Sequence, residues 1–220
     1  PAASEEISVR RNISLAEMTG GKLHIAHLST RGSLEAVRSA KRRGKHVTCE
    51  VTPHHLLLTD EAVKDYDTHT KMAPPLRAEE DRQALIEGLA DRTIDAIATD
   101  HAPHHADEKM VEFDQAPFGI VGLETAVALC LDRLVGQKVI SLVRLVELSS
   151  TQPARILGLS KGTLSVGADA DITVLDLERS LTVEPERFRS KSRNTPFKGW
   201  KLKGRAVKTI VSGKVAWSAD

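Results

Sequence analysis

Short apolar runs alternate with helix-like segments through the first hundred residues, and this alternation constrains the fold more than any other feature of the chain. Three runs have the length and composition of buried strands, at residues 23–28, 46–51 and 94–98. Helical periodicity separates them at residues 33–43 and 79–91. A strand–helix–strand order is typical of a parallel sheet with crossover helices. The sequence therefore predicts an α/β fold.

The chain changes character after Gly158. Before this point, further helices are expected at residues 4–18, 122–135, 141–149 and 152–158. After it, glycine and aspartate residues punctuate short β-type runs at residues 172–177, 207–211 and 214–217. Ser212 and Gly213, between the last two runs, predict a hairpin turn. We therefore expect two domains, an α/β domain over residues 1–158 and a β-rich segment over residues 159–220.

Composition and charge exclude several classes of partner. The chain has 31 Lys and Arg against 30 Asp and Glu, and only 3% aromatic residues, so neither a strong field nor a stacking surface indicates nucleic acid. No apolar stretch is long enough to span a bilayer and no signal peptide is recognisable, so no membrane contact is expected. Cys49 and Cys130 lie in apolar surroundings and are interpreted as buried thiols in a reducing compartment. We therefore expect a cytoplasmic protein.

Polar residues follow the ends of the three predicted strands, where an α/β barrel builds its active site. His27 ends the first strand, the His54-His55 pair follows the second, and Asp100 and His104 follow the third. His24 lies three residues before His27, so regular strand alternation would point it to the other face. Taken alone, His27 is better explained as a hydrogen-bonded core histidine than as a metal ligand.

Asp100 is harder to explain without a metal. A carboxylate at the end of an apolar strand needs a compensating partner, because burying an unpaired charge is costly. A buried structural aspartate is one alternative, but the nearby histidines favour a metal site, and imidazole with carboxylate suits zinc-like ions. Such an ion lowers the pKa of bound water to about 7 and polarises a carbonyl. A neighbouring carboxylate can then move the proton to a leaving nitrogen, which predicts hydrolysis of an amide-like bond.

A series of short blocks along the chain resembles dihydroorotase, a member of the amidohydrolase superfamily. In chain order the blocks are residues 24–30, 50–56, 71–77, 99–104, 116–119, 167–171 and 194–197. No single block is specific, but the ordered series is. The resemblance implies the C-terminal part of a TIM-like (β/α)8 barrel together with strands of a small β-sandwich. It also implies the reversible cyclisation of N-carbamoyl-L-aspartate to L-dihydroorotate in pyrimidine biosynthesis.

The resemblance implies a role for each matching residue. His27 would ligate one metal, and Asp100 would be both a metal ligand and the acid/base group. His104 would bind the substrate carboxylate, and the backbone around Phe118-Gly119 would hold the pyrimidine ring. At Ala73 the family often has an asparagine that contacts substrate, so only a backbone contact is expected there. The implied cofactor is Zn²⁺, as one or two ions.

Other parts of the family's metal centre have no counterpart in the chain. The first strand of the family carries a His-x-His pair followed by an arginine, and a later strand brings a bridging Lys or Asp and a further His. The His54-His55 pair matches none of these ligands and is expected to be structural or to support them. We therefore expect the remaining ligands to lie outside the chain, and residues 1–220 alone neither to close a barrel nor to turn over substrate.

Two other functions stay open. One is a non-catalytic, dihydroorotase-like structural partner of aspartate transcarbamoylase, which the presence of His27, Asp100 and His104 disfavours. The other is a cyclic amidohydrolase acting on a hydantoin, a dihydropyrimidine or allantoin. His104 argues against it, because hydantoins and allantoin lack the ring carboxylate of dihydroorotate. The expected partners are the small-molecule substrate, further copies of the chain and aspartate transcarbamoylase.

Overall fold

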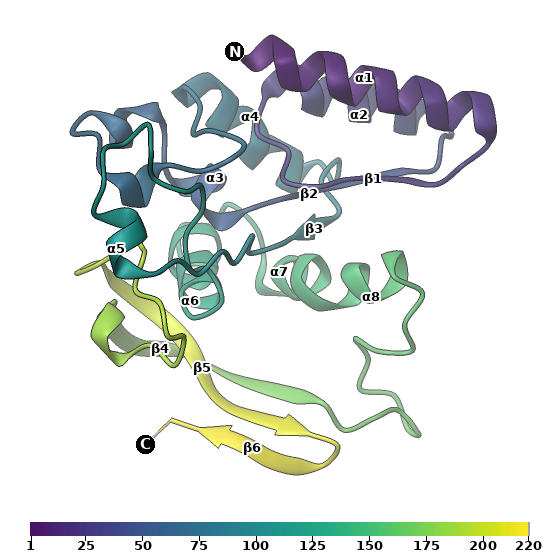
Figure 1. The fold of residues 1–220 in the computed structure, drawn as a ribbon. Coiled ribbons are helices and arrows are strands. Elements are labelled where there is room, and N and C mark those ends of the chain that lie inside the picture. The colour runs from purple at the N-terminus through teal and green to yellow at the C-terminus, as the bar shows by residue number, and fades with distance from the viewer. Residues whose placement is uncertain (220) are drawn as a thin grey trace. The chain divides into compact units, whose positions relative to one another are not determined.

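The computed structural model describes residues 1–219 and contains two separate three-stranded sheets (Figure 1). The first sheet is parallel and has the order β1-β2-β3, formed by β1 (Leu23–Ile25), β2 (Val47–Val51) and β3 (Ala96–Ile97). The second is antiparallel and consists of β4 (Ile172–Thr182), β5 (Lys201–Val211) and β6 (Lys214–Ser218). The predicted α/β character and the parallel pairing of the first three strands are confirmed. The parallel sheet is open, so the chain as described does not form a barrel.

Two predicted crossover helices connect the parallel strands. Helix α2 (Arg31–Arg42) begins after Thr30, whose hydroxyl accepts a hydrogen bond from the Ser33 amide, and α4 (Glu79–Ala90) begins with three acidic residues. Both features favour a helix start, because they satisfy free amides or oppose the positive end of the helix dipole. The predicted N-terminal helix is α1 (Ala2–Thr19), which packs against α2.

The remaining helical segments are short. The α-helices are α3 (Pro53–Leu57), α5 (Ala106–Lys109), α6 (Ala126–Cys130), α7 (Leu142–Val146) and α8 (Gln152–Ile156); the 3-10 helices are η1 (Asp60–Val63), η2 (Thr68–Thr70) and η5 (Pro185–Arg187); the π-helices are η3 (Leu131–Val135) and η4 (Glu147–Thr151). Because η4 joins α7 to α8, two helices predicted as separate form one continuous stretch. None of the described helices is long and apolar enough to cross a membrane.

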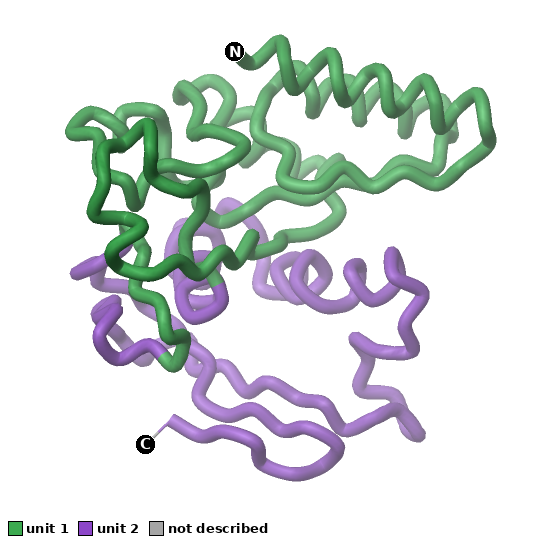
Figure 2. The backbone as a smooth tube through the Cα atoms, viewed as in Figure 1, with its two compact units in different colours: residues 1–122, 189–196 green, residues 123–188, 197–220 purple. Residues whose placement is uncertain are grey.

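The described chain divides into two compact units (Figure 2). The first contains residues 1–122 and a returning segment, residues 189–196. The second contains residues 123–188 and the chain from residue 197 on. The sequence-based boundary at residue 158 stays a prediction about the complete protein.

The core of the first unit fixes the positions of the parallel strands. Its side chains come largely from the sheet and the crossover helices, and those that are at most 1% exposed include Leu28, Leu34, Val37, Cys49, Val51, Leu56, Leu85, Leu89 and Ile94. The predicted burial of both thiols is confirmed, and burial raises the pKa of Cys49 and Cys130 to about 12. A close-packed core of this kind holds the strand ends in place, which is where the polar residues lie.

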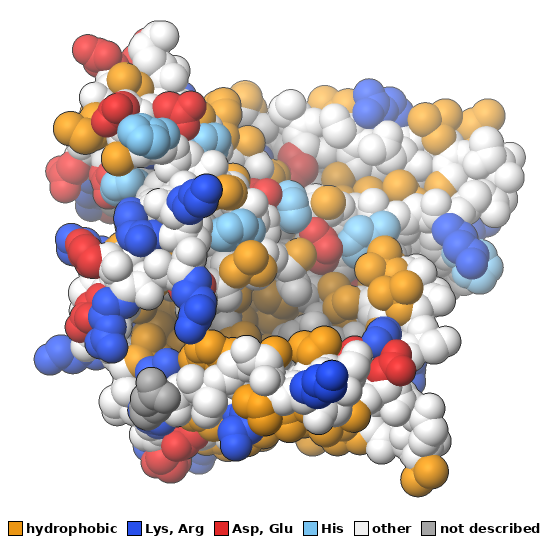
Figure 3. Space-filling model, turned by 60° about the horizontal axis from the view of Figure 1, so that its bottom comes forward, with side chains coloured by type: hydrophobic (Ala, Val, Ile, Leu, Met, Phe, Trp, Pro, Cys, Tyr) orange, Lys and Arg blue, Asp and Glu red, His pale blue; other side chains and the backbone are white. Residues whose placement is uncertain are grey.

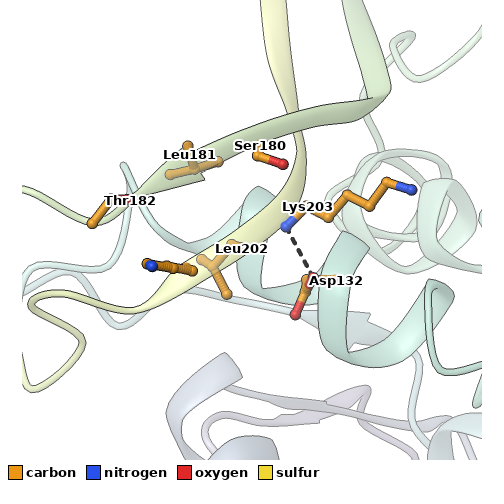
Figure 4. A pocket seen from close by; sticks show the side chains of 7 residues that line it. Asp132, Ser180, Leu181, Thr182, Leu202 and Lys203 are labelled. Atoms are coloured by element: carbon orange, nitrogen blue, oxygen red, sulfur yellow. Dashed lines mark hydrogen bonds between the residues drawn. The ribbon is translucent and has the colours of Figure 1, made fainter.

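In the second unit, the predicted hairpin between β5 and β6 is confirmed. Ser212 and Gly213 have φ values of 49° and 75°, the left-handed pair that a type I′ turn requires. A hollow of about 370 Å³ lies between β4, β5 and η3, where Lys203 N–H donates to Oδ1 of Asp132 at 2.9 Å (Figure 4). None of its lining residues is a predicted site residue.

Candidate functional site

The two predicted metal ligands follow the outer strands of the parallel sheet. His27 comes two residues after β1, and Asp100 comes three residues after β3. Both have left-handed backbone, with φ of 52° for His27 and 48° for Asp100. This conformation is uncommon for residues other than glycine, and it tends to occur at functional sites. The two side chains meet, with Nε2 of His27 3.4 Å from Oδ1 of Asp100.

Glu50, near the end of the middle strand β2, contacts two histidines. Its Oε1 lies 2.9 Å from Nδ1 of His27, and its Oε2 lies 3.1 Å from Nε2 of His24. The prediction that His24 and His27 face opposite ways is therefore wrong. The strand ends at Ile25 and His27 is left-handed, so regular alternation stops before it. Glu50 belongs to one of the matching sequence blocks, but sequence reasoning assigned it no role.

The charges in this cluster reinforce one another. Burial alone would raise the pKa of Glu50, but its contacts with His24 and His27 outweigh burial and lower that pKa to about 2. The contact with Glu50 raises the pKa of His27 against the effect of burial, and Asp100 adds to the rise. Nδ1 of His27 makes no hydrogen bond of regular geometry, although it lies 2.9 Å from Oε1 of Glu50. We therefore describe this contact as an ion pair.

His27 and Asp100 fit part of a zinc site. Two ligand atoms on a tetrahedral ion, each at about 2.0–2.1 Å, stand about 3.3 Å apart, and the observed separation is 3.4 Å. Within residues 1–219, however, no group of three or more His, Cys, Asp or Glu side chains is arranged to hold a metal ion. A catalytic zinc site requires at least three protein ligands. The residues present therefore fit a metal, but as one part of its ligand set.

His104 and Phe118 are joined across two loops. Nε2 of His104 lies 2.8 Å from the carbonyl oxygen of Phe118, so this nitrogen must carry the hydrogen and donate it. Nδ1 of His104 lies 3.7 Å from Oε2 of Glu108. Phe118 is 56% exposed, and the ammonium group of Lys71 lies 4.7 Å from the centre of its ring.

Gly119 lies where the same two loops approach most closely. Its φ is 107°, and a Cβ at this position would overlap the Cβ of Ala102. The amide of Ala102 donates to the carbonyl of Ile120 at 2.8 Å, and His101 pairs with Ile120 in an isolated parallel bridge. The Gly119 amide donates to the Lys71 carbonyl at 2.9 Å. The backbone expected to hold the substrate ring is therefore fixed from both sides.

The His54-His55 pair is buried, and the two rings lie 4.5 Å apart. His55 is tied to Thr52 Oγ1 at 2.7 Å and to the Pro74 carbonyl at 2.9 Å, whereas Nε2 of His54 has no hydrogen-bond partner. Burial lowers the pKa of His55 to about 4 and the pKa of His54 well below its usual value. Both rings are therefore neutral near pH 7. Ala73, next to Pro74, is exposed.

Two buried lysines hold the polar loop that follows His104. Nζ of Lys109 donates to the carbonyls of Thr68 and Pro117 at 3.1 and 2.6 Å, and Nζ of Lys71 donates to the carbonyl of Asp114 at 2.9 Å. Burial, and then the nearby charge of Lys71, lower the pKa of Lys109 to about 8. Figure 3 shows histidine side chains exposed on one face, with acidic side chains among them.

Comparison with known proteins identifies the family of the chain. The family model described as "Amidohydrolase family" matches residues 10–216. A dihydroorotase from Geobacter sp. (strain M21) is 57% identical over 219 residues, which is 100% of this chain and 51% of that protein. A dihydroorotase from Pelotomaculum thermopropionicum is 58% identical over 215 residues, 98% of this chain and 50% of that protein.

Solved structures give the same fold. The structure of an L-hydantoinase (dihydropyrimidinase) from Arthrobacter aurescens superposes with a TM-score of 0.95 at 33% identity, and covers 99% of this chain and 49% of its own. The chain thus spans about half the length of the curated relatives it matches.

Proposed function

The chain belongs to the amidohydrolase family, and from this premise we propose that it forms the C-terminal half of a dihydroorotase. This enzyme interconverts N-carbamoyl-L-aspartate and L-dihydroorotate. The observation that carries the proposal is the meeting of His27 and Asp100, 3.4 Å apart, at the ends of two strands of one parallel sheet. The identity of 57% to a dihydroorotase, against 33% to the hydantoinase structure, supports this substrate.

In the proposed enzyme, His27 and Asp100 would hold a zinc ion together with ligands from the N-terminal half. When bound, such an ion supplies an acidified water and polarises the amide carbonyl. Asp100 presents one carboxylate oxygen towards His27, and its other oxygen is then available to accept the proton of the attacking water. In the hydrolytic direction Asp100 passes this proton to the leaving ring nitrogen, and in cyclisation it removes the proton from the carbamoyl nitrogen.

Glu50 would orient His27 for its role. With the carboxylate of Glu50 beside Nδ1, the ring hydrogen is favoured on Nδ1, which leaves the lone pair on Nε2 facing Asp100. A carboxylate on the far nitrogen of a metal-binding histidine fixes its tautomer and strengthens it as a ligand.

His104 would bind the carboxylate of the substrate. Its Nε2–H is already donated to Phe118, so the ring binds an anion through Nδ1 only when it carries both hydrogens. The carbonyls of Phe118 and Gly119 each retain a second lone pair for the ring N–H groups, and Ala73 offers only its backbone. The buried His54-His55 pair would have a structural role as neutral groups, because His55 holds the Pro74 carbonyl next to Ala73.

The complete enzyme would close the parallel sheet into a barrel and assemble as a homo-oligomer, with aspartate transcarbamoylase as a candidate partner. A hydantoinase or dihydropyrimidinase is the second candidate function, favoured by the L-hydantoinase structure at a TM-score of 0.95. A non-catalytic partner of aspartate transcarbamoylase is the third. His-x-His followed by an arginine, encoded upstream of Pro1, would favour either enzyme over it.

The test uses the full-length product of the gene, including any residues encoded upstream of Pro1. We expect it to cyclise carbamoyl aspartate, and Asp100→Asn to abolish turnover while the fold is retained. Asp107→Asn is the matched control, because the Asp107 side chain is 84% exposed, and it should remain active. Near-normal turnover by Asp100→Asn would refute the assigned role. Hydrolysis of hydantoin without any action on dihydroorotate would favour the second function.

A further inference from the structure

Asn194 is buried in the first unit at the end of the returning segment, residues 189–196. It is 3% exposed and uses every polar group of its side chain. Its Nδ2 donates to the carbonyls of Ala102 and Gly119 at 2.9 and 3.1 Å, and its Oδ1 accepts from the His104 amide at 3.3 Å. Its backbone carbonyl accepts from the Val121 amide at 2.9 Å.

These partners lie on two segments that are separated in sequence. Residues 101–104 form one segment and carry His104, and residues 118–122 form the other and carry Phe118 and Gly119. The segments touch backbone to backbone, because the Ala102 amide donates to the Ile120 carbonyl at 2.8 Å and a Cβ on Gly119 would overlap the Cβ of Ala102. Asn194 bridges them with an N–H group to each and an oxygen to one.

Few other side chains can make this bridge. Two carbonyl acceptors and one amide donor converge on a single short planar group, which matches the amide of asparagine. A carboxylate of the same size would turn an acceptor oxygen towards two carbonyl oxygens, and an apolar side chain would remove a partner from three backbone groups that are buried or partly buried. A buried polar group left without a partner costs more than a typical hydrogen bond contributes.

We infer that Asn194 is a positioning residue that sets the distance between His104 and the Phe118–Gly119 backbone, and through it the affinity for substrate. The inference rests on the proposed function, because it takes His104 and Phe118–Gly119 as the groups that hold the substrate carboxylate and ring. Asn194 itself would touch neither the carboxylate nor the ring of the substrate, because its side-chain groups are all bonded to backbone. Its effect passes through the 2.8 Å contact between Nε2 of His104 and the Phe118 carbonyl, which spans the two segments.

The experiment compares Asn194→Ala and Asn194→Asp with the matched control Asn12→Ala in the full-length gene product. Asn12 lies on α1, and its side chain bonds only Arg11, its neighbour in the chain. We expect both Asn194 variants to raise KM for dihydroorotate about tenfold or more, which is the effect of about one lost hydrogen bond. Asn194→Asp should have the larger effect. Zinc content and kcat should change far less, and Asn12→Ala should match the wild type.

Hydrogen exchange measured by mass spectrometry tests the same bridge without the reaction. We expect faster exchange in peptides covering residues 101–104 and 118–122 of both Asn194 variants, and unchanged exchange in β2. A purely structural role would lower the active fraction, and hence kcat, without changing KM. An unchanged KM in folded Asn194→Ala would therefore overturn the inference, as would unchanged exchange in both peptides.

Two further outcomes are distinguishable. If the wild type lacks dihydroorotase activity, the proposed function fails, and the part of the inference that concerns substrate affinity fails with it. The exchange results still decide whether Asn194 joins the two segments. If neither variant folds, exchange in the wild type decides: slow exchange shared by the His104 and Val121 amides supports the bridge, and rapid exchange of the His104 amide refutes it.

Discussion

Replacing Gly119 with alanine should force apart the two segments that carry His104 and Phe118. At Gly119 two separate penalties meet: φ is 107°, and the new Cβ would overlap the Cβ of Ala102. Gly44 has only the first of them, since its φ is 72° and nothing lies within 4 Å of its added Cβ. Comparing alanine at the two positions therefore separates the backbone strain from the close approach.

The magnitudes follow from these contacts. Placing alanine in a left-handed conformation costs about 1–2 kcal/mol, so Gly44→Ala should lower the free energy of unfolding by about that amount. The backbone strain of alanine at the φ of Gly119 costs about 1–3 kcal/mol. Overpacking against Ala102 adds about 1–3 kcal/mol, because both Cβ atoms sit on backbone that is paired across the segments. Gly119→Ala should therefore cost about 2–6 kcal/mol in total.

The assay is urea unfolding of the full-length gene product and of each variant. Adding Ala102→Gly to Gly119→Ala removes the second Cβ, and it should restore the overpacking part, about 1–3 kcal/mol, while the strain remains. In Gly44→Ala the same second substitution should restore nothing. The reasoning is wrong if Gly119→Ala costs no more than Gly44→Ala, or if Ala102→Gly fails to recover any stability in the Gly119→Ala background.

Two further substitutions test the charges around the site. Glu50→Gln removes the carboxylate beside Nδ1 of His27 and should weaken zinc binding about 10- to 100-fold in a chelator competition. The control Glu61→Gln changes a side chain that is 69% exposed and should leave zinc affinity unchanged. Equal zinc affinity in the two variants would contradict the role of Glu50. Burial lowers the pKa of Lys109 from 10.5 to about 8. Between these two pH values the unfolded chain retains a proton that the folded chain has released, so this residue makes the free energy of unfolding increase as pH rises. Lys109→Met should lose this part of the pH dependence of urea unfolding, and an identical slope in the wild type and the variant would contradict the prediction.

Hydrophobic pattern was sufficient to predict the order of strands and helices, but not where the strands end. The first strand was predicted to reach residue 28 and ends at Ile25, and the third was predicted over residues 94–98 and covers only Ala96–Ile97. In both cases the apolar run continues past the paired residues into a turn with left-handed backbone. For the antiparallel sheet, the predicted strands were too short rather than too long. Strand β5 begins at Lys201, before the predicted residue 207, because charged residues on an exposed sheet hide the alternation.

The residues of the site were predictable to different degrees. The rule that functional side chains follow parallel strands indicated His27 and Asp100, and their side chains do meet. Glu50 obeys the same rule on the middle strand, so a stricter use of it would have included this residue. Asn194 gave no such signal. Its side-chain partners lie 75, 90 and 92 residues away in loops, and local patterns carry no information about contacts of that range.

The left-handed backbone of His27 and Asp100 has a structural cause in the sheet itself. Each residue lies between two backbone positions that are paired with a neighbouring strand or segment of the same chain. His27 is preceded by Ile25, paired with Cys49, and followed by Leu28, whose amide donates to the Glu50 carbonyl at 2.9 Å.

Asp100 lies between two such points as well. Before it, the amide of Ala98 donates to the Val51 carbonyl at 3.0 Å, and after it, His101 pairs with Ile120. A residue held on both sides cannot relax to an extended conformation without breaking one of these bonds, so the pairing maintains a strain of about 1–3 kcal/mol at each position. These backbone contacts direct both side chains towards each other, and the Glu50 carboxylate adds a side-chain contact to His27. In the proposed enzyme, the part of the metal centre that His27 and Asp100 would form is therefore preorganised by the sheet, and a metal ion would add to that order without having to create it.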